Sequence, residues 1–191
     1  MPPKAKFTKE DIIEAAVKLT RENGEKALTA RNLASMLGTT SKPVFGLFSG
    51  MDEVRSEVIK RADEIYHEYL AKEMASGEYP PYKASGMGYI RFAREEKHLF
   101  RLLFMRDRSN EIIEEDRESI KPLIDLIVKN TGITESDAYR FHLEQWLFVH
   151  GIASMIATNF LLWDDGDIGN SLTRIYKGLM NEYLSEEKTN G

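Results

Sequence analysis

Acidic and histidine side chains are the groups of this 191-residue chain that could ligate a metal or transfer protons. Glu64 and His67 stand three positions apart, so both would lie on one face of a helix. A di-iron bundle needs a Glu-x-x-His pair on each of two helices, and the sequence around His142 does not supply the second pair. A solvated helix face explains these charges better. We therefore expect no metal, no cofactor and no enzymatic activity.

The composition narrows the chemistry further. The chain has no cysteine, which excludes disulfides and thiol nucleophiles and favours a reducing cytoplasm. It contains no phosphate-binding loop, no Gly-x-Ser-x-Gly elbow and no dinucleotide fingerprint. No signal peptide is visible. The most apolar run, residues 146–163, includes His150 and Asn159, so we expect a buried helix rather than a membrane span, and no membrane partner.

Thr29 and Arg31 are polar residues at the start of a predicted helix. The Thr29 hydroxyl or N–H suits a phosphate, and Arg31 can reach a phosphate or a base edge. A solvated surface charge is the ordinary alternative for Arg31. Residues 1–50 carry a net charge of +3, whereas residues 51–191 carry −8. This asymmetry is typical of a basic module joined to an acidic body.

Helical periodicity runs through nearly the whole chain and predicts an all-α fold of about nine helices. Thr8 should cap a first helix that ends at Gly24, and Thr29 should cap a second that ends at Gly38. A short third helix, capped by Thr40 or Ser41, should end near Phe48. A long fourth helix should cover residues 52–73. The remaining predicted helices cover about 82–95, 97–106, 111–130 (kinked or split at Pro122), 134–162 and 167–185.

The tight turn between the second and third helices indicates a helix-turn-helix unit. Its small core should contain Leu28, Leu33, Leu37, Val44 and Phe48. An ordinary helical hairpin would show the same periodicity, so the pattern of residue types has to decide between the two.

The stretch "LTARNLASMLGTTSKPVFGLFSGMDEV", residues 28–54, resembles the helix-turn-helix of the TetR family of bacterial repressors. The matching positions, in order, are Leu28-Thr29, Arg31, Leu33-Ala34, Leu37-Gly38, Phe45, Phe48 and Asp52-Glu53. The resemblance implies a DNA-binding domain over residues 1–52, linked onward by the fourth helix, whose partner is double-stranded DNA. The DNA-binding residues that it implies are Thr29, Arg31, Thr40, Ser41, Lys42, Pro43 and Phe45.

Three departures from the family pattern fall on this surface. Phe45 replaces a tyrosine that would bond a phosphate, Met51 replaces a lysine, and Gly46 and Leu47 replace larger or polar groups. Fewer phosphate contacts predict a shallower dependence of DNA affinity on salt. The sequence leaves two equal alternatives for Lys4, Lys6 and Lys9: an N-terminal arm that compensates for the missing phosphate contacts, or a solvated tail.

The segments "YIRFAREEKHLFRLLF" (89–104) and "QWLFVHGIASMIA" (145–157) resemble a TetR subgroup named for a Trp–His–Gly signature, here Trp146, His150 and Gly151. The resemblance implies that residues 53–191 bind a small-molecule effector and dimerise. An aromatic interior suits an apolar or aromatic effector, although core packing is the simpler explanation for each aromatic residue. The implied ligand-binding residues are Tyr89, Phe92, Phe100, Leu103, Phe104, Ile127, Trp146 and His150.

The same resemblance implies a homodimer in which the last two long helices of each subunit meet. Two apolar stripes run along residues 134–162, and the sequence does not decide which one faces the partner. The implied interface residues are Ile152, Met155, Asn159, Leu172, Ile175, Tyr176 and Leu179. We expect a ligand-responsive repressor that binds a palindromic operator as a dimer. The alternative is a helical ligand carrier or adaptor that keeps the repressor shape without binding DNA.

Overall fold

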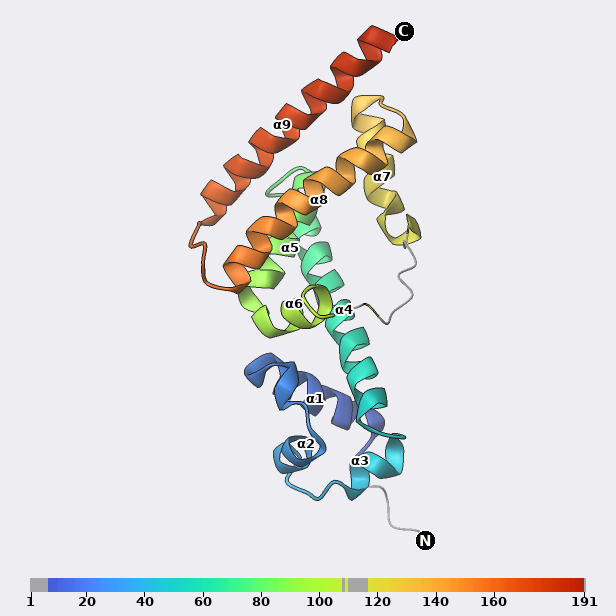
Figure 1. Ribbon diagram of the computed structural model, residues 1–191, viewed down its shortest axis with the longest axis vertical. Helices are drawn as coiled ribbons and strands as arrows, with labels where there is room; N and C mark the ends of the chain where they lie inside the picture. The colour runs from blue at the N-terminus through green and yellow to red at the C-terminus, as the bar shows by residue number, and fades with distance from the viewer. Residues whose placement is uncertain (1–6, 108, 110–116, 191) are drawn as a thin grey trace. The chain divides into compact units, whose positions relative to one another are not determined.

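The computed structural model describes residues 7–107, 109 and 117–190 (Figure 1). The described residues form α-helices, one short 3-10 helix and connecting segments, and they contain no strand, which confirms the predicted all-α fold. Contacts divide the chain into two compact units. The first unit comprises Met1–Glu68 and Glu95–Arg106, and the second comprises Tyr69–Arg94 and Asp107–Gly191.

The first unit begins with three short helices whose ends follow local sequence signals. Helix α1 (Lys9–Asn23) starts at Thr8, which forms a capping box with Asp11, and it ends at Gly24, where φ is +80°. The 3-10 helix η1 (Glu25–Ala27) connects it to α2 (Ala30–Met36), which Thr29 caps as predicted. Gly38, with φ of +63°, then turns the chain toward α3 (Lys42–Leu47). These ends agree with the sequence-based predictions.

A small apolar core fixes α2 and α3 in place. Leu28, Leu33, Val44 and Phe48 are buried as predicted, whereas Leu37 is half-buried. Pro43 occupies the first turn of α3, where the N–H that it lacks would have no helical partner.

Helix α4 (Met51–Ser76) begins in the first unit and ends in the second. Its first turn is held by Glu53, whose carboxylate accepts hydrogen bonds from the backbone N–H and the hydroxyl of Ser49. These bonds and the ammonium of Lys9 lower the pKa of Glu53 to about 2. The helix is therefore anchored directly after α3, at the point where the sequence predicted a break.

Helix α6 (Lys97–Phe104) completes the first unit although it lies near the middle of the chain. It packs on α1, where the ring of His98 lies 3.1 Å from the place that a side chain on Gly24 would occupy. Arg21 of α1 also pairs with Glu96, at 2.7 Å between Nε and Oε2. The sequence indicated the helix itself but not its association with the N-terminal helices.

The second unit contains α5 (Pro81–Glu95), α7 (Arg117–Thr131), α8 (Glu135–Ala157) and α9 (Asp165–Asn190). Helix α8 packs on both α7 and α9, and Figure 1 shows α8 and α9 antiparallel and side by side. Pro122 lies inside α7 without ending it. One core cluster of this unit consists of Ile124, Ile127, Ile133, Ala138, Phe141 and Met180.

Several predicted helix limits are corrected by the structure. The predicted helix 134–162 ends at Ala157, because Asn159 adopts φ of +59° and the N–H groups of Phe160 and Leu161 turn back to the carbonyl of Met155. The last helix starts at Asp165 rather than residue 167. The helix expected at 97–106 ends at Phe104. The expected helical start at 111–116 lies outside the described residues.

A buried ion pair connects α4 to α5 within the second unit. Glu73 is 2% exposed, and its Oε2 lies 2.8 Å from Nη1 of Arg91. Arg91 and Arg94 both bond Asp165 at the start of α9, and Arg94 donates to the carbonyl of Trp163. These contacts tie three helices and the α8–α9 loop together.

Gly88 allows the close approach of α4 and α5. A Cβ atom at this position would lie 3.1 Å from the carbonyl oxygen of Tyr69 and 3.2 Å from Cα of Leu70. Both are backbone atoms, which move only if a helix moves. The position therefore requires glycine for packing rather than for a special φ value.

Candidate DNA-binding and ligand-binding sites

The predicted DNA-binding residues fall on the segment from the start of α2 to the middle of α3. Oγ1 of Thr29 accepts a hydrogen bond from the N–H of Asn32 at 3.2 Å, so this hydroxyl already caps α2. It retains its own proton as a donor to a phosphate. Arg31, in the first turn of α2, is exposed. Thr40 is exposed in the loop that follows, and Ser41 is half-buried.

Helix α3 has a buried side and an exposed side. Val44 is fully buried, whereas Lys42, Phe45 and Gly46 are exposed. Helical geometry places these three residues on the side opposite Val44. Pro43 is half-buried at the flank. We refer to Lys42, Phe45 and Gly46 as the outer face of α3.

The cations of α1 and of the first-unit part of α4 are held by carboxylates. Arg61 of α4 bonds Glu14, Glu64 and Glu68 at 3.0–3.1 Å. The other pairs in this unit are Lys9–Glu53, Lys18–Glu22, Arg21–Glu96, Arg55–Glu25, Arg55–Asp52 and Lys60–Glu57. Within the described residues, Arg31 and Lys42 form no ion pair with a carboxylate. On α2 and α3, these two charges are therefore the ones available to an anionic partner.

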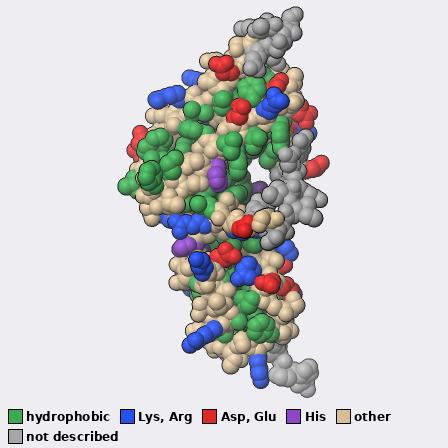
Figure 2. Space-filling model, viewed as in Figure 1, with side chains coloured by type: hydrophobic (Ala, Val, Ile, Leu, Met, Phe, Trp, Pro, Cys, Tyr) green, Lys and Arg blue, Asp and Glu red, His purple; other side chains and the backbone are tan. Residues whose placement is uncertain are grey.

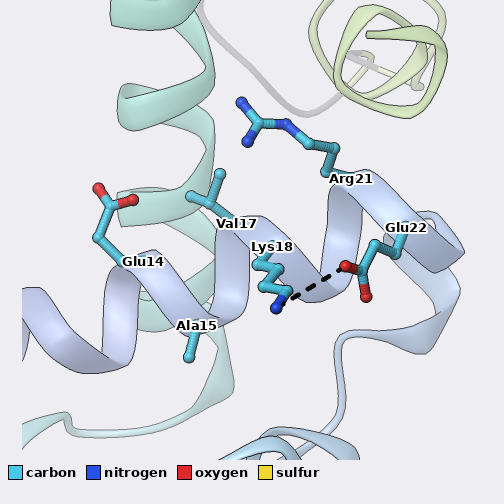
Figure 3. A pocket seen from close by; sticks show the side chains of 6 residues that line it. All are labelled: Glu14, Ala15, Val17, Lys18, Arg21 and Glu22. Carbon is cyan, nitrogen blue, oxygen red and sulfur yellow. Dashed lines mark ion pairs between the residues drawn. The ribbon is translucent and has the colours of Figure 1, made fainter.

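A shallow hollow lies along α1 (Figure 3). It is lined by Glu14, Ala15, Val17, Lys18, Arg21 and Glu22, all from this helix. Glu14 pairs with Arg61 of α4, Arg21 pairs with Glu96 directly before α6, and Lys18 pairs with Glu22. None of the residues predicted to bind a ligand lines this hollow. Its charged groups are thus already used in ion pairs.

The predicted ligand-binding residues divide between the two units. Phe100, Leu103 and Phe104 belong to α6 of the first unit, where the ring of Phe104 packs edge-on against Tyr66 at 5.4 Å. The other five belong to the second unit, and they are Tyr89, Phe92, Ile127, Trp146 and His150. Within this second group Phe92 and Ile127 are buried in the core.

Two tyrosine–histidine pairs join α5 to α8 in the second unit. The hydroxyl of Tyr89 lies 2.8 Å from Nδ1 of His150, and that of Tyr82 lies 3.1 Å from Nδ1 of His142. The indole of Trp146 stacks on His150, with ring centres 5.0 Å apart. Burial lowers the pKa of both histidines, which favours their neutral forms. The tryptophan and histidine of the Trp–His–Gly signature are thus in direct contact.

The sequence analysis missed two buried polar groups of the second unit. Gln145 lies on α8 between His142 and His150 in the sequence, is 5% exposed, and its Nε2 has no hydrogen-bond partner among the described residues. Oε1 of Glu73 is likewise buried without a partner there. Helical spacing places both on an apolar stripe, since Gln145 stands four residues from Phe141 and Glu73 four residues from Tyr69, but residue type alone favoured exposure.

The predicted dimer-interface residues differ in exposure. Ile152 and Leu172 are buried inside the subunit, and Tyr176 and Leu179 pack against its core cluster. Ile175 is half-buried, whereas Met155 and Asn159 are exposed. Figure 2 shows hydrophobic side chains gathered over α8 and the α8–α9 loop. The exposed large apolar residues there are Leu143, Leu147, Met155, Phe160, Leu162 and Trp163.

These features define an all-helical protein with an N-terminal helix-turn-helix and a C-terminal helical unit. A family model described as the Tetracyclin repressor-like C-terminal domain matches residues 82–179, about half of the chain. The chain therefore belongs to the TetR family of regulators, which confirms the resemblance found in the sequence. A comparison with curated proteins gave no match.

Neither a membrane span nor a metal site is present among the described residues. No helix there combines the length and apolarity needed to cross a membrane. In the same part of the chain, no three His, Asp or Glu side chains are grouped so as to hold a metal ion. Glu64 and His67 of α4 contact different partners. The Glu64 carboxylate bonds Arg61, whereas Nε2 of His67 lies 3.5 Å from Oδ2 of Asp63.

Proposed function

We propose that this protein is a non-enzymatic, ligand-responsive transcriptional regulator that binds DNA through α2 and α3. The observation that carries the proposal is the distribution of charge in the first unit. Carboxylates hold the cations of α1 and of the first-unit part of α4, whereas Arg31 and Lys42, on the helix-turn-helix, have no carboxylate partner in the described part of the chain. Uncompensated positive charge at a helix-turn-helix is what phosphate binding requires.

The exposed stripe on α8 supports a homodimer. Leu143, Leu147, Gly151 and Met155 recur every four residues and so follow one side of the helix. Leu147 is 57% exposed, and a Cβ at Gly151 would meet no atom of the described residues within 4 Å. Gly178 of α9 is open in the same way. A second subunit would bury this apolar area and use the space beside the glycines.

The dimer also explains how DNA recognition would be palindromic. Two α3 helices related by twofold symmetry would contact half-sites one helical turn apart, or a multiple of it. Replacing Leu147 by Glu should convert the protein to a monomer in sedimentation equilibrium. Met74→Glu, at an exposed apolar position of α4, is the matched control and should leave the dimer intact. A dimeric Leu147→Glu variant would reject this interface.

The second unit is the proposed effector-binding region. Its aromatic pairs and the buried Gln145 amide suit an apolar or aromatic molecule that carries one hydrogen-bond acceptor. Binding there would change the position of α4 and release DNA, so effector and DNA would be negatively coupled. An effector that releases the protein from DNA would end repression, so this coupling favours a repressor.

Selection of DNA from a random pool, repeated at several salt concentrations, tests the proposal. A regulator should recover one palindrome and should lose affinity for it as salt rises. A helical ligand carrier would bind small molecules and recover no preferred DNA sequence at any salt concentration. That second result would reject the DNA-binding role and favour the carrier.

A further inference from the structure

The outer face of α3 combines one charge with an exposed aromatic ring. Phe45 is 50% exposed, next to Lys42 one turn earlier and Gly46 directly after it. On the other side of the helix Val44 is fully buried, and Phe48, which follows α3, is 3% exposed. The fully buried contacts of this segment are thus made by Val44 and Phe48, while half of the Phe45 side chain is left exposed.

A phenylalanine ring offers a protein–DNA contact only apolar area. It has no hydrogen-bonding group, so it cannot bond a phosphate or a polar base edge. The major groove presents one apolar group, the C5-methyl group of thymine, and phenylalanine is among the side chains that pack on it. The contact that fits Phe45 is therefore a thymine methyl group.

The surroundings of Phe45 favour DNA as the occupant of this face. Lys42 and Arg31 are exposed cations without a carboxylate partner in the described part of the chain, so the same helix-turn-helix that exposes the ring also carries charges suited to phosphates. Within the described residues, a Cβ at Gly46 would meet nothing within 4 Å. The missing side chain lets the backbone beside Phe45 come close to the groove.

We propose that Phe45 packs on a thymine methyl group in each half-site, so that operator preference depends on that methyl group. The inference rests on the proposed DNA-binding function and adds the base chemistry that α3 recognises. Burying one methyl group is equivalent to about a fourfold change in affinity, or about fifteenfold for two half-sites.

The test replaces each thymine of the selected operator by deoxyuridine, which lacks only the methyl group. One symmetry-related pair of replacements should weaken binding by wild-type protein about fifteenfold. Phe45→Ala should bind the thymine operator more weakly and should bind both operators equally well. Lys42→Ala is the matched control, because it should bind more weakly but keep the wild-type sensitivity to the methyl group. Thermal melting of Phe45→Ala checks that its fold is retained.

The outcomes separate this inference from the function on which it rests. Failure to select any preferred DNA sequence rejects the DNA-binding function itself. A selected operator without a thymine pair, or one in which every deoxyuridine replacement is neutral, rejects the methyl contact alone. Equal sensitivity in wild type and Phe45→Ala also rejects it, since another residue would then read the methyl group.

Discussion

Two pairs of polar residues, one pair in each unit of this protein, are placed in opposite ways. In the first unit, Arg31 and Lys42 are exposed and available, and they lie on short helices that begin at Thr29, which caps α2, and at Ser41 before Pro43. In the second unit, Glu73 and Gln145 are buried, and each has one atom without a hydrogen-bond partner among the described residues. A polar group on the surface can be removed at little cost to folding, whereas a buried one is coupled to stability. We therefore expect mutations of the exposed charges in the first unit to change binding, and mutations of the buried groups in the second unit to change stability.

The largest expected effect is on stability, in the second unit. Arg91→Leu leaves the Glu73 carboxylate buried without its cation, and we expect a loss of about 3 kcal/mol or more in the free energy of unfolding. Urea denaturation measures this loss. The double variant Glu73→Leu/Arg91→Leu removes both charges and should recover much of it. A double variant no more stable than Arg91→Leu would show that the pair is not the cause.

Two helical glycines should respond in opposite directions. Gly88→Ala forces a methyl group against the backbone of α4 and should destabilise the second unit by about 1–3 kcal/mol. Gly46→Ala meets open space in the first unit and should be neutral or stabilising by up to about 1 kcal/mol, because alanine favours a helix. Thermal melting of both variants measures the difference. If both changes had the same sign, the contrast in packing between these glycines would be refuted.

The charges of the helix-turn-helix should affect DNA affinity without affecting stability. Arg31→Ala and Lys42→Ala should each weaken operator binding about tenfold and reduce the salt slope by about 0.9 for each phosphate that the variant no longer neutralises. Lys60→Ala removes the same charge from an ion pair with Glu57 and serves as the matched control. Fluorescence anisotropy at several salt concentrations gives both quantities. Unchanged binding in both variants would overturn the assigned DNA surface.

The smallest expected effect is the response of the second unit to pH. Burial lowers the pKa of His142, so the folded state favours the neutral ring more than the unfolded chain does. The resulting stability is present above the unfolded pKa of about 6.5 and is lost as pH falls through the lower folded value. His142→Gln should reduce the fall in melting temperature between pH 7.5 and 5.5. His67→Gln, at an exposed position of α4, should melt as wild type does across this range.

Local signals explain how much of the fold was predictable from the sequence. Thr8 and Thr29 cap helices, and Gly24 and Gly38 end them, because these residues act through their own backbone and nearest neighbours. The end of α8 was not predicted because apolar residues continue past it. Only the left-handed conformation of Asn159 marks the end, and asparagine adopts it less often than glycine does.

The partners of the buried polar residues could not be predicted for a different reason. Glu73 meets Arg91 across two helices, and Arg91 in turn meets Asp165 far along the chain. Such partners depend on tertiary packing, which residue spacing does not report. The same limit applies to the predicted ligand residues, since no sequence pattern indicated that Phe100 and Phe104 belong to the first unit.

The conformation of Asn159 has a consequence for how this family member could diverge. The residue ends α8 and directs the chain into a loop in which Phe160 and Leu162 are 80% and 87% exposed. A β-branched residue there would cost about 1–2 kcal/mol in the left-handed region and would favour a different path for the loop. A single codon change at this position could therefore reshape the exposed apolar edge while the aromatic interior of the same unit keeps its sequence. If the proposed dimer and effector site exist, partner choice and effector choice would then be free to evolve separately.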